Sequence, residues 1–185
     1  MMMGYLILVL GLLLWSGAHV FKRIAPDRRA AMGDAGKGLV AVLSLVAIVL
    51  MVLGYRWAPG DQFWSANSIT TGINNLLMLL VFYLFAASGM KTAVTRMVRH
   101  PQLWAVRIWA IAHFIVNGDF ASLILFGGLF VWAQIAARLI NRDVPQWEKN
   151  PPATVGKEIG AVVGAVVVLA AVGWIHGLIG PWPFG

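Results

Sequence analysis

The stretch "MGYLILVLGLLLWSGAHVF", Met3 to Phe21, contains no charged residue, and Lys22 and Arg23 follow it directly. A helix of about 20 apolar residues spans the hydrocarbon core of a bilayer. Five further apolar runs occur at about residues 38–57, 72–88, 102–117, 120–139 and 159–180. Because lipid offers no hydrogen-bond partners to an open backbone, each run is expected to be a helix. The sequence therefore predicts an all-α integral membrane bundle of about six transmembrane helices, forming a single domain over residues 1–185.

The composition also indicates a membrane protein. Of the 185 residues, 60% are hydrophobic and only 11% are charged, which is more apolar surface than a soluble domain of this length can bury. The chain has no cysteine, so disulfides, thiolate metal sites and cysteine nucleophiles are excluded. Any metal ligand must therefore come from His, Asp, Glu or Met. The first apolar run lacks a preceding positive charge and a following cleavage pattern, so we do not expect a removable signal peptide.

The basic residues indicate topology rather than nucleic-acid binding, although the net charge is +7. Loops rich in Lys and Arg stay on the cytoplasmic side of a membrane. We therefore predict three cytoplasmic loops, both termini outside, and a multi-pass protein of the bacterial inner (cytoplasmic) membrane. Arg56 lies in an outer segment and Arg107 lies inside the fourth run. The other twelve basic residues fall in the three loops: Lys22, Arg23, Arg28, Arg29 and Lys37; Lys91, Arg96 and Arg99; Arg138, Arg142, Lys149 and Lys157.

All four histidines lie in or at the ends of the predicted helices. His19 is near the cytoplasmic end of the first, His100 is at the cytoplasmic start of the fourth, His113 is in its outer half, and His176 is near the outer end of the sixth. Ionisable residues inside a membrane usually mark a functional site. His100 and His113 point to nearly opposite faces of their helix, whereas His113 and Asn117 share one face. Depth in the membrane therefore pairs His113 with His176.

Arg107 lies roughly 10 Å along the fourth helix from His100, and all seven Asp and Glu residues fall in loops or at helix ends. A buried arginine there needs an anion, such as a carboxylate or phosphate of a bound molecule, unless its side chain extends to the cytoplasmic edge. Imidazoles on several helices together with this arginine suggest a b-type haem, in which histidine ligates iron and arginine pairs with a propionate. The alternatives are histidines that only hydrogen-bond between helices, or a bound quinone, lipid or other metal.

Four segments in order, "WSGAH", "RHPQLW", "AHFIVNGD" and "WIHGLIG", resemble the NnrU family over nearly the whole chain. The resemblance implies a link to denitrifying bacteria and to the production of active nitrite and nitric oxide reductases. Partners would then be membrane lipid and nitrogen-oxide reductase machinery. The family is similar to plastid 15-cis-ζ-carotene isomerase, a membrane enzyme with histidine-held haem b, which implies isomerisation of a lipophilic polyene. That likeness assigns the iron ligands to His113 and His19, so we rank His113 first, His19 second and His176 as the rival.

Two other functions remain open. The stretch "VRHPQLWA" resembles the Arg-His-Pro motif of isoprenylcysteine-type membrane methyltransferases, which would place Arg99 and His100 near a methyl donor, although the family's late acidic residue is missing here. A helix start explains the same residues, because Pro101 fits a first turn. The third possibility is a non-enzymatic membrane scaffold. It would use the basic loops or a stripe of small residues in the sixth helix, which we expect to pack within the bundle: Gly156, Gly160 and Gly164.

Overall fold

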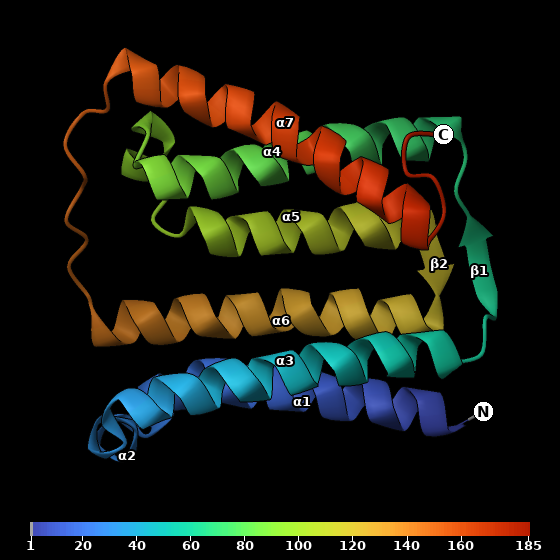
Figure 1. The fold of residues 1–185 in the computed structure, drawn as a ribbon, viewed down its shortest axis with the longest axis horizontal. Helices are drawn as coiled ribbons and strands as arrows, with labels where there is room; N and C mark the ends of the chain where they lie inside the picture. The colour runs from blue at the N-terminus through green and yellow to red at the C-terminus, as the bar shows by residue number, and fades with distance from the viewer. Residues whose placement is uncertain (1) are drawn as a thin grey trace. The chain divides into compact units, whose positions relative to one another are not determined.

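A computed structural model describes residues 2–185 of the protein, and most of these residues are helical. Figure 1 shows the helices running lengthwise beside one another within each part of the chain. This confirms the predicted all-α membrane fold. The elements in chain order are α1 (Met2–Ile24), α2 (Pro26–Ala31), α3 (Gly33–Trp57), β1 (Gln62–Ser65), α4 (Ser68–Met90), the 3-10 turn η1 (Ala93–Arg96), α5 (Pro101–Val116), β2 (Asn117–Asp119), α6 (Phe120–Asp143) and α7 (Val155–Ile179).

Five helices, α1, α3, α4, α6 and α7, are long and apolar enough to cross a membrane. The sixth predicted run forms α5, which has 16 residues. At 1.5 Å per residue α5 is about 24 Å long, which is shorter than the roughly 30 Å hydrocarbon core. The chain is therefore a multi-pass membrane protein. The side of the membrane on which its termini lie stays a prediction.

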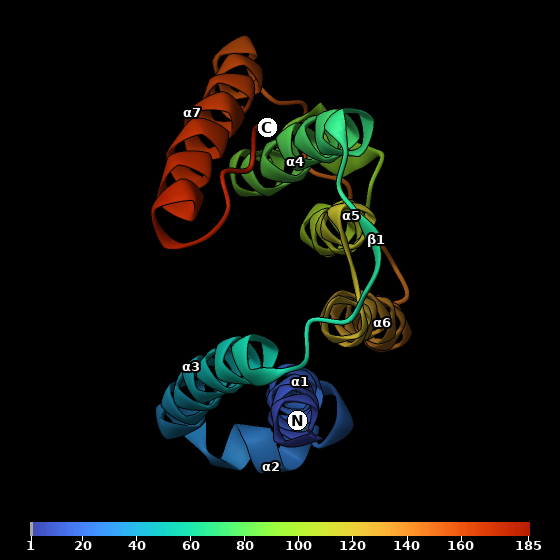
Figure 2. The ribbon, with the colours of Figure 1, turned by 90° about the vertical axis from the view of Figure 1, so that its right-hand side faces the viewer.

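The helices group into two compact units. Unit 1 comprises residues 2–63 and 118–145, and unit 2 comprises residues 64–117 and 146–185. In unit 1, α1 packs against both α3 and α6, and in unit 2, α4 packs against both α5 and α7; Figure 2 views both groups end-on. Each unit thus contains two consecutive long helices and one helix from later in the chain. The two strands pair with each other at the points where the chain passes from one unit to the other. The prediction of a single domain stays a prediction.

The helices extend beyond the apolar runs that predicted them. α3 begins at Gly33 and α6 continues to Asp143, because hydropathy marks only the part of a helix that suits lipid. α4 begins where the Asn67 side chain accepts hydrogen bonds from the backbone N–H groups of Ile69 and Thr70, as expected of an N-cap residue. The first basic loop also contains α2, a helix that the sequence analysis did not predict. Its signal is Pro26 at the first helical position.

Glycines bring α1 and α3 together in unit 1. A Cβ atom added at Gly11 would lie 2.8 Å from the backbone nitrogen of Met51, and one added at Gly54 would lie 2.7 Å from the Cα atom of Leu8. Such distances are too short for real side chains, so only glycine permits this approach. The two antiparallel helices are therefore in backbone contact.

Alanines bring α7 and α4 together in unit 2. Ala161 and Ala165 are buried on α7, and Ala87 is buried on α4. The glycine stripe of the sixth predicted helix contributes little by comparison. Only Gly160 has a close neighbour, the side chain of Met90. A Cβ at Gly156 or Gly164 would have no heavy atom of the described chain within 4 Å. The expected packing of this helix within the protein is present, and within the described chain only Gly160 of the stripe takes part in it.

Candidate functional site

His19 lies on α1 within an aromatic cluster of unit 1. Its Nδ1 atom is 2.8 Å from the backbone oxygen of Trp15, four residues earlier. The imidazole stacks on the Trp15 indole, with ring centroids 3.9 Å apart, and its centroid is 5.3 Å from that of Trp132 on α6. The ring is thus held by one hydrogen bond and two aromatic neighbours.

His113 lies on α5 in unit 2 and is held in the same local way. Its Nδ1 atom is 3.0 Å from the backbone oxygen of Trp109, again four residues earlier. The Trp109 and His113 ring centroids are 4.9 Å apart. Trp15–His19 and Trp109–His113 are therefore two copies of one arrangement, with the sequence pattern Trp-x-x-x-His. This repetition is present in the sequence, but it was not among the predicted site signals.

This arrangement decides which ring nitrogen can act as a ligand. A backbone carbonyl only accepts hydrogen bonds, so the Nδ1 atom beside it must carry the proton. In a neutral imidazole the lone pair is then on Nε2, which is the atom that can bind a metal. A hydrogen bond from Nδ1–H to a carbonyl also fixes the orientation of the ring and raises the basicity of Nε2, as is usual for metal-ligating histidines.

His176 on α7 has the same tautomer, but a different segment sets it. Its Nδ1 atom is 2.8 Å from the backbone oxygen of Pro181 in the C-terminal tail. The tail folds back because two glycines of α7 leave room for its aromatic rings. A Cβ at Gly177 would clash with the ring of Trp182, and one at Gly173 would clash with the ring of Phe184. The orientation of His176 therefore depends on the tail.

The structure places the histidines in different units. His113 and His176 both belong to unit 2. Both are in the last turn of their helices. His19 belongs to unit 1. Unit 2 thus contains both members of the pair that depth in the membrane predicted, whereas the tryptophan arrangement is shared by the pair that the resemblance predicted. Which pair would bind iron stays a prediction.

Arg99 and His100 lie where α5 begins. His100 is the N-cap residue and Pro101 is at the first helical position. The backbone oxygen of His100 accepts a hydrogen bond from the N–H of Trp104 at 2.9 Å. Both Arg99 and His100 are half-buried. The helix-start interpretation of this motif accounts for its backbone geometry.

Arg107 and Asn117 also lie in unit 2. Arg107 is 6% exposed, and its guanidinium carbon is 4.8 Å from the centroid of a Trp104 ring, within the range of a cation–π interaction. This buried cation does not extend to an exposed edge of the structure. The Asn117 side chain donates to the backbone oxygen of His113 at 2.8 Å. Asn117 therefore closes the end of α5 and holds the helical turn that carries His113.

Two indole N–H groups beside His19 are buried and lack an acceptor. They are Nε1 of Trp15 and Nε1 of Trp132, neither of which has a hydrogen-bond partner within residues 2–185. The ring centroids of these tryptophans are 5.5 Å apart. Buried indole N–H groups normally find a partner, so a bound molecule that offers an acceptor would be stabilised here.

Comparison with known proteins gives the chain its family. The profile of the family described as "NnrU protein" matches residues 7–183. The chain belongs to the NnrU family. No curated protein and no solved structure matches it. The matched NnrU region contains all four histidines and both Trp-x-x-x-His patterns.

The NnrU chain also has a buried polar network in unit 1 that the sequence analysis missed. The Asp119 carboxylate accepts from the backbone N–H of Ser122 at 2.7 Å and from its hydroxyl at 2.8 Å. The Ser122 and Tyr55 hydroxyl oxygens are 2.7 Å apart, and Ser122 is fully buried. Asp-x-x-Ser at the start of an apolar run was the available signal. The network fastens the beginning of α6 to the end of α3.

Proposed function

We propose that this NnrU-family protein binds haem b through its membrane histidines, with His113 as the residue that would hold the iron. The observation that carries the proposal is the orientation of the imidazoles. His19, His113 and His176 each place Nδ1 on a backbone carbonyl and keep the lone pair on Nε2. Haem iron requires only one or two such ligands from the protein. This donor set fits the group, because the chain supplies oriented imidazoles and has no thiolate.

Two histidines are candidates for a second ligand beside His113. His19 is supported by its Trp-x-x-x-His arrangement, which matches that of His113, and by the two buried indole donors beside it. His176 is supported by its place in the same unit as His113 and by its oriented imidazole. Substitution of each separately distinguishes them.

Other residues would hold and orient the group. Arg107 is a buried cation, and such a residue favours an anionic group such as a propionate carboxylate. Asn117 and Trp109 fix the turn and the ring orientation of His113. Haem supplies electron transfer or the binding of a small molecule at iron. The contribution of the protein is to keep the imidazoles oriented through the hydrogen bonds of Nδ1 to backbone carbonyls.

The experiment is absorption spectroscopy of the protein purified in detergent from haem-replete cells. We expect a Soret band that is lost in His113→Ala and is shifted or lost in one of His19→Ala and His176→Ala. His100→Ala is the matched control, because His100 is on the same helix as His113 but at its opposite end. Wild-type protein without a Soret band would refute the haem proposal. Equal loss in His100→Ala would refute the assignment to His113.

We infer that the haem protein acts in nitrogen-oxide respiration in the bacterial cytoplasmic membrane, supporting production of active nitrite and nitric oxide reductases. Membership of the NnrU family supports this role. The test is a deletion strain, in which nitrite and nitric oxide reductase activities should fall and should return with the wild-type gene but not with the His113→Ala gene. Unchanged reductase activities, together with cis-to-trans conversion of a polyene by the purified protein, would instead establish the isomerase function.

A further inference from the structure

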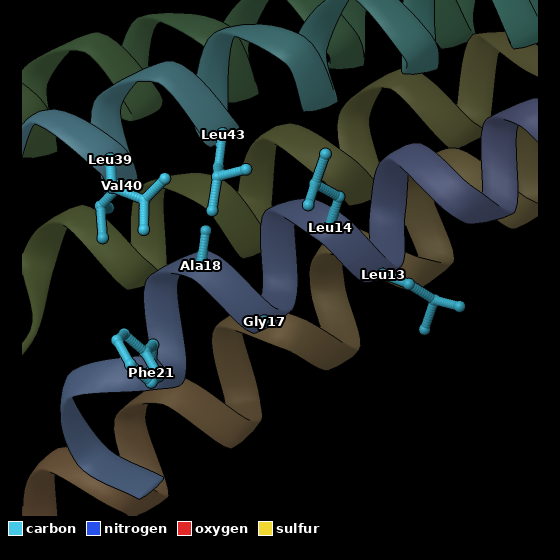
Figure 3. A pocket seen from close by; sticks show the side chains of 8 residues that line it. All are labelled: Leu13, Leu14, Gly17, Ala18, Phe21, Leu39, Val40 and Leu43. Atoms are coloured by element: carbon cyan, nitrogen blue, oxygen red, sulfur yellow. The ribbon is translucent and has the colours of Figure 1, made fainter. Parts of the chain in front are cut away.

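An apolar groove runs between α1 and α3 in unit 1. Its cavity has a volume of about 290 Å³. Figure 3 shows Val40 and Leu43 of α3 opposite Ala18 of α1. Gly17 and Phe21 also line the groove, and a Cβ at Gly17 would have no neighbouring heavy atom within 4 Å. From Leu13 to Phe21 the groove follows about 12 Å of helix.

A basic pocket lies at one end of the same helices. Its volume is about 860 Å³. α1, α2, α3 and α6 all contribute to it, and every one of these helices belongs to unit 1. Asp143 is the acidic residue in its lining, which contains five basic residues: Lys22, Arg23, Arg29, Lys37 and Arg142.

The groove and the pocket follow one another along both helices. On α1, Phe21 lines the groove and Lys22 lines the pocket. On α3, Leu39 lines the groove and Lys37 lines the pocket. Because α1 and α3 are antiparallel, these two transitions occur at the same end of the helix pair. The apolar groove therefore ends beside the basic residues of the pocket.

Acidic residues neutralise only part of this charge. Asp143 is 3.4 Å from Arg23 and 3.2 Å from Arg142, and Asp34 is 2.8 Å from Lys37. These ion pairs are partly or fully exposed to solvent, so each pair is weak and contributes little to the stability of the protein.

Two cations of the pocket remain outside these ion pairs. Lys22 forms no ion pair with any residue of the described chain. Arg29 donates to the backbone oxygen of Gly33 at 3.1 Å, and its guanidinium lies against Gly36, where a Cβ would be 2.6 Å from Nη1. Lys22 and Arg29 are therefore the cations most available to a ligand.

We propose that this site binds an anionic phospholipid, with the phosphate in the basic pocket and an acyl chain in the apolar groove. A basic pocket between helices at a membrane face attracts anionic lipid headgroups. The adjoining groove favours a lipid over a free phosphate, because an acyl chain can pack against the apolar side chains of the groove while the cations hold the headgroup. The site uses neither His113 nor His176, which belong to the other unit.

The experiment is native mass spectrometry of the full chain in detergent, titrated with one lipid at a time. Phosphatidylglycerol supplies the charge and the chains, phosphatidylcholine with identical chains supplies no net charge, and glycerol 3-phosphate supplies charge without chains. We expect phosphatidylglycerol to bind with one lipid per chain and at least ten-fold more tightly than either of the others. Equal binding of the two lipids would overturn the proposal, as would equally tight binding of glycerol 3-phosphate.

Variants test the two halves of the site separately. Each cation near an anionic headgroup strengthens binding about fivefold, so Lys22→Gln with Arg29→Gln should weaken phosphatidylglycerol binding about 30-fold. Gly17→Leu should also weaken it, because Gly17 lines the groove and an added Cβ there would have no heavy atom within 4 Å, which leaves room for a larger side chain to occupy the groove. The matched control is Arg56→Gln with Lys91→Gln, which removes two cations outside the pocket.

The outcomes of the variants are decisive in both directions. The proposal is supported if the control variant binds phosphatidylglycerol as tightly as wild type and both site variants bind it more weakly. Losses as large in the control as in the double variant would reveal a general charge effect and overturn it. If the double variant fails to fold, undiminished binding by folded Gly17→Leu is sufficient to overturn it.

Discussion

Gly54→Ala tests whether backbone contact between α1 and α3 stabilises unit 1. The added Cβ would lie 2.7 Å from the Cα atom of Leu8 and 2.9 Å from the backbone oxygen of Gly4. Ordinary contacts begin near 3.4 Å, and the backbone nitrogen of Leu8 would be nearer still, so the helices must separate by more than 0.7 Å. Side-chain rotation cannot relieve the clash, because the neighbouring atoms belong to the backbone and Leu8 is fully buried.

The magnitude follows from two opposing terms. Overpacking a close contact costs about 1–3 kcal/mol, whereas replacing glycine by alanine within a helix stabilises it by up to about 1 kcal/mol. The net loss in the free energy of unfolding should be about 1–2 kcal/mol. For a chain of this size this corresponds to a fall in Tm of about 2–8 °C. The nine tryptophans allow the transition to be followed by intrinsic fluorescence in detergent.

Gly38→Ala is the matched control on α3. A Cβ at Gly38 would have no neighbouring heavy atom within 4 Å, so only the helix-propensity term remains and Tm should be unchanged or slightly raised. The reasoning fails if Gly54→Ala is as stable as Gly38→Ala. It also fails if both variants lose the same stability, because the loss would then not come from the contact with α1.

Three further predictions concern other parts of the molecule. Gly177→Ala should displace Trp182 and release the tail that holds His176, which limited proteolysis would detect as faster cleavage after residue 180, with Gly156→Ala unchanged. Tyr55→Phe removes the hydrogen bond to Ser122 and should lower the free energy of unfolding by about 0.5–1.5 kcal/mol, whereas Tyr83→Phe serves as the comparison on α4. The chain has no cysteine, so Arg28→Cys and Asp61→Cys each give a single labelling site. A membrane-impermeant maleimide added to intact cells should label Asp61→Cys and not Arg28→Cys. Labelling of Arg28→Cys instead would show that the predicted orientation is reversed.

Hydropathy predicted the membrane helices well because it reports directly on what lipid accepts. All six apolar runs became helices, and the shortest predicted run became the shortest of the long helices, α5. The same signal could not give the grouping into units. α6 packs with α1, and α7 packs with α4. More than sixty residues separate the two helices of each pair in the chain. The packing surfaces combine alanines and glycines with aromatic pairs such as Trp15–Trp132, and no local pattern specifies which residues are partners.

In the candidate site, too, features within one helix could be predicted from the sequence, whereas contacts between distant segments could not. The depth of each histidine followed from counting residues, and the Trp-x-x-x-His arrangement could have been found by the same means, because a helix places residues four apart on one face. The contact of the His19 imidazole with Trp132 could not be predicted from the sequence, because it joins two helices that are far apart in the chain, α1 and α6. The fold-back of the tail onto Gly173 and Gly177 likewise required the structure.

α1 carries parts of both proposed binding sites, and helix geometry predicts that they are separable. Gly17 and His19 are two residues apart, so their side-chain directions differ by about 200°. Gly17 lines the lipid groove, whereas His19 contacts Trp15 and Trp132. Gly17→Leu should therefore weaken phosphatidylglycerol binding and leave the absorption spectrum unchanged, while His19→Ala should leave phosphatidylglycerol binding unchanged whichever histidine ligates iron. Each variant is the control for the other. If either variant lost both phosphatidylglycerol binding and the wild-type absorption spectrum, the two sites would be coupled through α1, and the predicted separation would be wrong.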